Sequence, residues 1–383
     1  MKFEKLGNIA DIIAGQSPPS STYNSEGNGI PFFQGKADYG EKYPSVRYWC
    51  TEPTKISLPD DILISMRAPV GPVNINTIES CIGRGLSAIR VKKNVSRDFI
   101  YFWLKQNQHI IAAKQTGSTF KAITQKILSE IVVPFPSYSD QLQIASILSK
   151  AENLIAQRKE SIRLLDEFLK STFLEMFGDP VRNERGWEIV GIETACSDIF
   201  LGLTNKVDYV EEGGFPLIRT TDIKGGKLSF ENVRYISEAQ HRKITKNRIS
   251  KRGDILVSKS GTLGTTAIVD TDIEFTTYES IITIQPNPVK LVNHYLNFLL
   301  KNTNFQIKML GGKTGGTVGH LNLLMFREIT LPLPPLELQT QFAQIVEKTE
   351  ALKSQYQQSL QELENLYGSL SQKAFRGELL SEL

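Results

Sequence analysis

Two stretches of the sequence decide its fold: IVVPFPSYSDQLQIA at residues 131–145 and ITLPLPPLELQTQFA at residues 329–343. Each reads Pro-x-Pro and then Gln-x-x-(Ile/Phe)-Ala, and a single offset of 198 residues carries the first onto the second without a gap. Gly-x-Thr precedes both at the same offset, at residues 117–119 and 315–317. A repeat this long indicates two copies of a whole domain, because solenoid repeats span only about 20–50 residues.

The repeat extends upstream, where the offset drifts as expected if loops differ in length. DILIS at residues 61–65 matches DILVS at residues 254–258, and GIP at residues 29–31 matches GFP at residues 214–216. The order of the segments is the same in both copies. The sequence therefore predicts a duplicated fold along the chain.

Each copy begins with a region of mixed composition, at residues 1–137 and 186–335. Short alternating apolar runs bounded by Gly, Pro and Asn, such as LSAIR at residues 86–90, are typical of strands. Helical patterns interrupt them near residues 97–114 and 291–309. We therefore predict an α+β protein with two mixed α/β globular domains.

Each copy ends with a helical region, at residues 138–178 and 336–383. Neither region contains proline, and apolar residues recur at alternating spacings of three and four, as in helices packed side by side. About 40 residues with a rise of ~1.5 Å each form a rod roughly 60 Å long, which must bury its apolar stripe. We expect the two helices to pair as an antiparallel coiled coil that separates the domains. The predicted seam consists of Ile144, Ile147, Ala151, Leu154, Ile162, Leu165 and Leu169 in the first region and Phe342, Ile345, Leu352, Tyr356, Leu360, Leu363 and Tyr367 in the second.

The composition argues against several classes of protein. The 383 residues are 40% hydrophobic and 22% charged, as in a soluble globular protein of two domains. No apolar run reaches the roughly 18 residues of a membrane span and no signal peptide follows Met1, so we expect a cytoplasmic protein with no membrane contact. Cys50, Cys81, Cys196 and the four histidines are scattered, so neither a disulfide framework nor a metal site is predicted. The net charge of +3 permits nucleic-acid binding without requiring it.

A search for catalytic motifs is negative. Gly311-Gly-Lys-Thr314 resembles the end of a phosphate-binding loop, but Ile307 stands where the first glycine of that loop is required. Pro59-Asp60 is not followed by the acidic-x-Lys triplet of a nuclease, and a turn is the simpler interpretation. The Asn/Asp-Pro-Pro-aromatic motif of adenine methylation is also absent. We therefore predict no catalytic residues and no enzymatic activity in this chain.

The whole arrangement resembles the specificity subunit of a type I restriction–modification system. The resemblance rests on two ordered copies of Gly-x-Thr, Pro-x-Pro and Gln-x-x-(Ile/Phe)-Ala, each leading into a heptad helix, and it covers essentially the whole chain. It implies that residues 1–137 and 186–335 are target recognition domains, each reading one half of a bipartite site in double-stranded DNA. The second copy has Phe342 and Val346 where the first has Ile144 and Leu148, a change that a core tolerates.

The resemblance also implies partners and cofactors. The helical regions would set the spacing between the half-sites and dock two methylation subunits, which a restriction and translocase subunit joins for ATP-driven cleavage. This chain would bind no cofactor itself, because S-adenosylmethionine, ATP and Mg²⁺ act on the partner subunits. The residues expected to form the seam and to dock partners are Ile144, Ile147, Leu154, Leu165, Phe342, Ile345, Leu352 and Leu363.

Candidate DNA contacts are donors, acceptors and cations on loops that follow strands, because such side chains can reach a groove or a phosphate. In the repeat, residues 34–36 fall opposite residues 219–222, and residues 65–67 fall opposite residues 258–260. The candidates are Gln34, Lys36, Arg67, Arg84, Lys121, Arg219, Thr220, Lys259 and Lys313. Arg67, Arg219 and Lys259 are favoured, because a cation beside a small residue at a strand end can approach phosphate closely. The alternative for each is a solvated loop residue without a ligand.

Two other functions stay open at this point. The chain could be a helical protein–protein scaffold whose globular domains do not read DNA. It could also be an autonomous enzyme, such as a nuclease with a decayed motif. Sequence-specific binding separates the first from a DNA reader, and cleavage of plasmid with magnesium tests the second.

Overall fold

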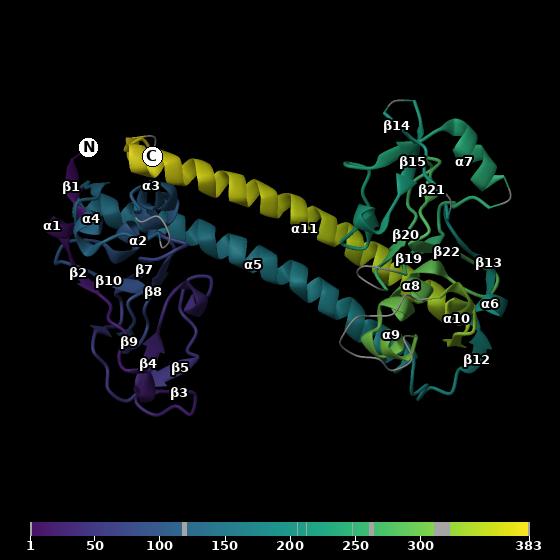
Figure 1. The fold of residues 1–383 in the computed structure, drawn as a ribbon, viewed down its shortest axis with the longest axis horizontal. Coiled ribbons are helices and arrows are strands. Elements are labelled where there is room, and N and C mark those ends of the chain that lie inside the picture. Colours follow the sequence, from purple (N-terminus) through teal and green to yellow (C-terminus); the bar gives the residue numbers. More distant parts are fainter. Residues whose placement is uncertain are drawn as a thin grey trace. The chain divides into compact units, whose positions relative to one another are not determined.

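The computed structural model describes residues 2–116, 121–204, 206–211, 213–246, 248–259, 264–309 and 322–381. The chain divides into two compact units, and Figure 1 labels many of the helices and strands of both. Unit 1 consists of Met1–Glu160 and Gln358–Leu383, and unit 2 consists of Ser161–Gln357. Each unit therefore contains one globular domain together with parts of two long helices.

Unit 1 contains a four-stranded sheet and a five-stranded sheet. The first has the order β2 (Ala10–Ala14), β10 (Leu86–Val91), β7 (Ile62–Ser65), β8 (Val73–Ile75), and all its pairs are antiparallel. The second has the order β3 (Tyr23–Asn24), β5 (Tyr48–Cys50), β4 (Ile30–Phe33), β9 (Ser80–Ile82), β6 (Ile56–Ser57), with β4 and β9 parallel. A ladder of β1 (Phe3–Lys5) with β11 (Val132–Pro134) joins the two ends of the domain, and its helices are α1 (Leu6–Ile9), α2 (Arg97–Gln106), α3 (Gln108–Ala113) and α4 (Gln125–Ser129).

Unit 2 repeats this topology, as the predicted duplication requires. Its four-stranded sheet has the order β13 (Cys196–Leu201), β22 (Ile281–Pro286), β19 (Ile255–Ser258), β20 (Thr266–Ile268), which matches β2, β10, β7 and β8 position by position. Its second sheet has the order β14 (Tyr209–Val210), β18 (Arg234–Ile236), β15 (Phe215–Ile218), β21 (Thr276–Thr277). The remaining elements are the pairs β12 (Glu188–Gly191) with β23 (Thr330–Leu333) and β16 (Ile223–Lys224) with β17 (Lys227–Leu228), and the helices α6 (Ile192–Ala195), α7 (Glu238–Thr245), α8 (Asn293–Lys301), α9 (Thr303–Met309) and α10 (Leu323–Arg327).

The repeated motif DIL(I/V)S provides one of the two inner strands of each four-stranded sheet. Its apolar residues are fully buried, and its aspartate, just before the strand, closes the preceding turn by accepting a backbone N–H. Asp61 is also paired with Arg90, whereas Asp254 accepts a hydrogen bond from the neutral Gln285 at 2.9 Å. Burial without a charged partner raises the pKa of Asp254 above its ordinary value.

The glutamine of the repeated motif ties each long helix to a domain. Gln141 is fully buried; its Oε1 accepts from the N–H of Ser96 at 2.9 Å, and its Nε2 donates to the carbonyl of Pro136 at 3.0 Å. Gln339 accepts from the N–H of Val292 at 2.8 Å and donates to the equivalent carbonyl of the second Pro-x-Pro motif at 2.8 Å. Both ends of each buried amide are satisfied, which explains the fixed spacing between Pro-x-Pro and Gln.

The long helices are α5 (Tyr138–Phe177) and α11 (Leu336–Arg376). In unit 1, Lys159 pairs with Glu364 at 2.9 Å, while in unit 2 Asp166 pairs with Lys353 at 2.5 Å. As the residue number on α5 increases, the residue number of its partner on α11 decreases, so the two helices run antiparallel. The predicted pairing is confirmed. Among the described residues, none of the helices combines the length and the apolar character needed to cross a bilayer.

The seam differs from the prediction at two residues. Leu154 and Leu352 are 51% and 37% exposed, whereas Ile155 is buried and the ammonium of Lys353 lies at the interface with Asp166. The next seam residue after Ala151 is Ile155, four positions along, and not Leu154, three positions along. A shift of one position turns a helical side chain by about 100° around the helix axis. Of the other predicted seam residues, Ile144 and Phe342 are buried in the two cores, Ile147 and Ile345 pack against them, and Leu165 and Leu363 are half-buried.

A charge cluster fixes α5 to the domain of unit 1. The carboxylate of Glu152 bonds the ammonium of Lys42 at 2.8 Å and also that of Lys105 from α2. Burial alone would raise the pKa of Glu152, but the two ion pairs outweigh it and hold that pKa below its ordinary value. The cluster therefore stabilises unit 1 while Glu152 is ionised.

Candidate nucleic-acid interface

In unit 1, backbone hydrogen bonds bring the ends of several strands together. The N–H of Gly83 donates to the carbonyl of Phe33 at 2.8 Å, and the N–H of Met66 donates to that of Gly85 at 2.8 Å. The N–H of Ala68 donates to the carbonyl of Lys121 at 3.2 Å. These bonds place residues 33–36, 66–68, 83–85 and 121–123 side by side, and we call these four segments the turn cluster of unit 1. Although they are far apart in sequence, they carry all the DNA-contact candidates of the first copy.

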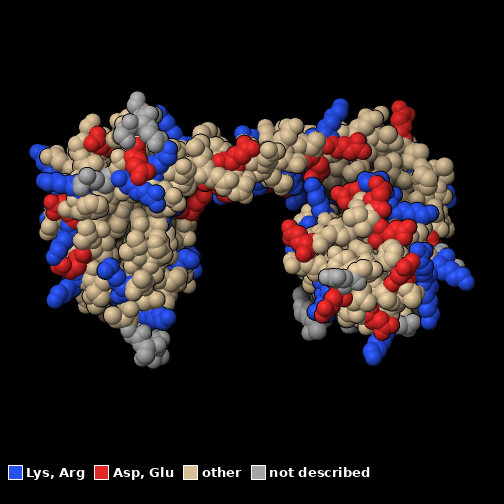
Figure 2. Space-filling view, turned by 90° about the horizontal axis from the view of Figure 1, so that it is seen from above, with Lys and Arg blue, Asp and Glu red and all other residues tan. Residues whose placement is uncertain are grey.

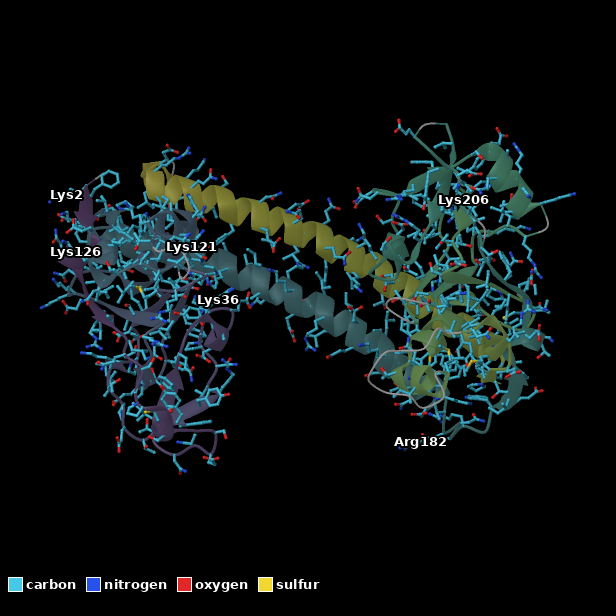
Figure 3. All side chains as sticks on the ribbon, viewed as in Figure 1. Lys2, Lys36, Lys121, Lys126, Arg182 and Lys206 are labelled. Atoms are coloured by element: carbon cyan, nitrogen blue, oxygen red, sulfur yellow. The ribbon has the colours of Figure 1, made fainter. Side chains whose placement is uncertain are left out.

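The turn cluster of unit 1 presents free cations to solvent. Its candidate residues are Gln34, Lys36, Arg67, Arg84 and Lys121, and all five are exposed. None of the four cations forms an ion pair with another described residue. Figure 3 shows Lys36 and Lys121 on one side of the unit, away from Lys2 and Lys126.

The buried carboxylate of Asp38, close by in the sequence, is already engaged within the domain. Asp38 accepts hydrogen bonds from the N–H groups of Gln34 at 2.7 Å and Gly35 at 3.2 Å, and from Nε of Arg47 at 2.9 Å. It is therefore already neutralised within the domain. The cations of the turn cluster remain available to a polyanion, and Gln34 adds a donor and an acceptor that can meet a base edge.

Unit 2 builds the same framework from different side chains. The N–H of Tyr278 donates to the carbonyl of Ile218 at 2.8 Å, and the N–H of Lys259 donates to that of Ser280 at 2.9 Å. These two bonds match those of Gly83 and Met66 in unit 1, so residues 218–222, 259 and 278–280 form a turn cluster of unit 2. Lys259 is half-buried and has no ion pair with a described residue, and Thr220 is half-buried at the start of a single 3₁₀ turn, Thr220–Asp222.

Arg219 is engaged within the protein, which the sequence did not predict. Its Nε and Nη2 bond the two oxygens of the buried Asp222, each at 3.1 Å, and Nη2 also donates to the carbonyl of Asn232 at 3.2 Å. The edge of the guanidinium formed by Nε and Nη2, which could otherwise read a guanine, is therefore occupied. In unit 1, Arg47 pairs with Asp38 from a different place in the sequence, with both of its bonds to the same oxygen, Oδ1. Arg219 therefore supports the turn cluster of unit 2, and its contact with DNA stays a prediction.

Some candidates lie outside the described residues, and other residues were missed. Lys313 and both Gly-x-Thr motifs fall in segments that the structure does not describe. Sequence reasoning missed the loop that contains the exposed Lys206, which Figure 3 labels, and which follows Leu203. The N–H of Leu203 donates to the carbonyl of Thr277 at 2.7 Å, so this loop begins beside the turn cluster. The only sequence signal was its position directly after the first long strand of the copy.

The surface charge is mixed outside the turn clusters. Figure 2 shows Lys and Arg interspersed with Asp and Glu on the visible face of both units, in keeping with the net charge of +3. Such a surface gives weak sequence-independent attraction to DNA, because that attraction grows with the number of phosphates that cations neutralise.

The described residues offer no grouping of metal ligands and one notable cavity. No set of three or more His, Cys, Asp or Glu among them could hold a metal ion. A cavity of about 350 Å³ in unit 2 is lined by Gly225, Gly226, Gly264, Thr265, Thr266, Lys301 and Gln306. It contains a single titratable side chain, Lys301, whose pKa burial lowers.

Comparison with known proteins agrees with the duplicated architecture. The family profile of the type I restriction modification DNA specificity domain matches residues 1–164 and 198–365. A putative type I restriction enzyme MjaX specificity subunit from Methanocaldococcus jannaschii is 46% identical over 160 residues, which cover 41% of this chain and only 38% of that relative. The type I restriction enzyme EcoBI specificity subunit from Escherichia coli is 22% identical over 98% of this chain and 86% of its own length.

A solved structure shows the same fold. A crystal structure of a type I restriction–modification system S subunit from M. genitalium matches 98% of this chain and 96% of its own, with a TM-score of 0.60 and 17% identity. At this identity the match shows the arrangement of the backbone, and it does not transfer the role of any single residue.

Proposed function

The chain belongs to the type I restriction modification DNA specificity family, and from this premise we propose that each of its units reads one half of a bipartite site in double-stranded DNA. The observation that carries the proposal is the pair of turn clusters. Their backbone hydrogen bonds match, while their side chains differ in charge and in hydrogen-bonding groups. A shared frame with different side chains is what two readers of two different half-sites require.

The side chains in the turn cluster of unit 1 suit two kinds of DNA contact, to phosphates and to base edges. Arg67, Lys36 and Lys121 are exposed cations that suit phosphates and fix the register on the duplex. Gln34 and Arg84 sit on turns at the strand ends and suit base edges in the major groove, adenine for Gln and guanine for Arg. A scaffold whose domains bind no DNA would not need these unpaired cations, and two matches to a DNA specificity profile favour the reader over the scaffold.

The helices are proposed to set the gap between the half-sites and to dock two methylation subunits. Leu164 and Phe168 of α5 are 49% and 50% exposed, and they lie one turn apart on the same face of the helix. A methylation subunit that packed on this face of α5 would cover both side chains. Leu154, which lies outside the seam, is a further exposed apolar residue of α5.

In this proposal the chain is a cytoplasmic, non-catalytic subunit with recognition domains at residues 1–137 and 186–335. S-adenosylmethionine acts on the methylation subunits, and ATP and Mg²⁺ act on a restriction and translocase subunit. The chain itself contributes the choice of sequence and the spacing of the two halves.

Co-expression with the cognate methylation subunit tests the proposal. Sequencing of host genomic DNA should reveal methylated adenines in one bipartite motif with a fixed gap. Omitting this chain should abolish the motif, and the purified chain alone should neither methylate nor cleave plasmid in the presence of magnesium. A complex that methylates without sequence preference, or a motif that persists without this chain, would contradict the proposal.

A further inference from the structure

We propose that Glu279 is a base-reading residue of unit 2 that accepts a hydrogen bond from the N4 amino group of a cytosine. The inference rests on the proposed function and adds to it a specific residue and the base that it reads. Glu279 lies in the turn cluster of unit 2, and nothing in its sequence context singled it out.

Glu279 occupies the place that Arg84 occupies in unit 1. Each is the middle residue of a three-residue turn, and the first N–H of that turn donates to the last residue of a strand, Phe33 or Ile218, at 2.8 Å in both units. The turn closes in the same way, with an N–H to C=O bond of 2.9 Å from Leu86 to Gly83 and from Ile281 to Tyr278. Because these two backbone bonds match, the two side chains leave the backbone at equivalent points, although the N–H of Arg84 donates to the hydroxyl of Ser17 and that of Glu279 to a backbone carbonyl.

The carboxylate of Glu279 has no partner within the described part of the chain. Its backbone N–H donates to the carbonyl of Leu203 at 3.0 Å, but its side chain forms no ion pair or hydrogen bond with a described residue. The cation that follows the neighbouring strand, Arg219, is held by Asp222. A structural role for the carboxylate would require a partner that these residues do not supply.

A free carboxylate on a DNA-binding face is unfavourable unless it meets a donor. Phosphates repel it, and the bases offer donors only at amino groups. In the major groove, cytosine itself presents only its N4 amino group, whereas adenine presents both its N6 amino group and the acceptor N7. A carboxylate therefore prefers cytosine, and the same turn position in unit 1, with Arg84, suits guanine.

Motif mapping with two variants tests the assignment. Complexes of the cognate methylation subunit with the wild-type chain, with Glu279→Ala or with Glu279→Gln are expressed, and methylated adenines are mapped on host genomic DNA. In the wild type, one position of one half-site should be cytosine. Alanine should reduce the preference for cytosine there by at least about fivefold, and glutamine should shift the preference toward adenine, which it can bind through two hydrogen bonds.

Two controls separate base reading from damage to the fold. Glu188 is an exposed carboxylate on β12, and Glu188→Ala makes the same change of charge without altering the motif. Binding of a short duplex that lacks the motif should be equal or tighter with Glu279→Gln, because a negative charge has been removed from the face. A variant that had unfolded unit 2 would instead bind this duplex more weakly than the wild type.

An unchanged motif in both Glu279 variants would overturn the inference while leaving the proposed function intact. So would a change that appears in both half-sites, because Glu279 belongs to one unit only. A wild-type complex that yields no bipartite motif would overturn the proposed function and this inference with it.

Discussion

Replacing Arg219 by alanine should loosen unit 2 locally and leave the DNA sequence that it reads unchanged. The guanidinium bonds both oxygens of Asp222 at 3.1 Å, and Asp222 also closes its own turn by accepting the backbone N–H of Arg219 at 2.9 Å. Asp222 is 4% exposed. Removing the side chain of Arg219 therefore leaves a buried negative charge without its cation.

The magnitude follows from this burial. Removing one partner of a fully buried ion pair costs about 3–5 kcal/mol. The Arg219 side chain is 27% exposed, so water can reach the vacated position and recover part of that loss. We expect a cost of about 2 kcal/mol, nearer the value of a lost charged hydrogen bond than that of a sealed ion pair.

Hydrogen exchange of the intact chain measures this cost where it arises. Peptides that cover residues 215–236 should exchange about 30-fold faster in Arg219→Ala if they open locally, because each 1.4 kcal/mol is a factor of ten. Asp222→Asn in the same chain should restore part of the protection, because it removes the uncompensated charge. The matched control is Arg47→Ala, which should raise exchange around Asp38 and not in unit 2.

Methylation mapping completes the test. Unchanged protection of residues 215–236 in Arg219→Ala, together with a relaxed base in one half-site, would refute the structural role. Arg219 would then read DNA as the sequence had suggested.

Three further outcomes follow from the structure. Arg67→Ala and Lys121→Ala should each reduce the steepness of the fall of log K for duplex binding with log salt concentration by about one, without changing the preferred sequence. Titration of duplex binding at several salt concentrations measures this slope, and a changed motif would mean base contact instead. Glu152 has a pKa held below its ordinary value, so the stability it gives unit 1 is full above the unfolded pKa of about 4.3 and is lost as pH falls through the folded pKa. Glu152→Gln should remove that part of the pH dependence in thermal unfolding below about pH 5, and an identical pH profile would count against the ion pairs. Inserting seven residues after Glu160 and seven after Gln357 keeps the heptad register and adds ~10 Å to each helix, so the gap in the methylated motif should widen by about three base pairs; a fixed gap would exclude the helices as the spacer.

The sequence alone was sufficient for features that depend on periodicity and repetition. The offset of 198 residues predicted the duplication, and the absence of proline with a three-and-four spacing predicted the helices that the structure shows at Tyr138–Phe177 and Leu336–Arg376. These features are local, since a helix or strand leaves its period in the residues that form it. The Gln of the repeated motif was visible too, although its two buried hydrogen bonds were not.

Only the tertiary structure decided which side chains are free to act. Leu154 lies outside the seam and Ile155 inside it, because the register is set by the facing helix and not by the spacing alone. Arg219 is engaged, because Asp222 is buried beside it. Glu279 shares its turn position with Arg84 because hydrogen bonds between distant segments build the same frame twice. The sequence records the period of each element, but the partners of a side chain depend on residues far away in the chain, and that pairing exists only once the chain has folded.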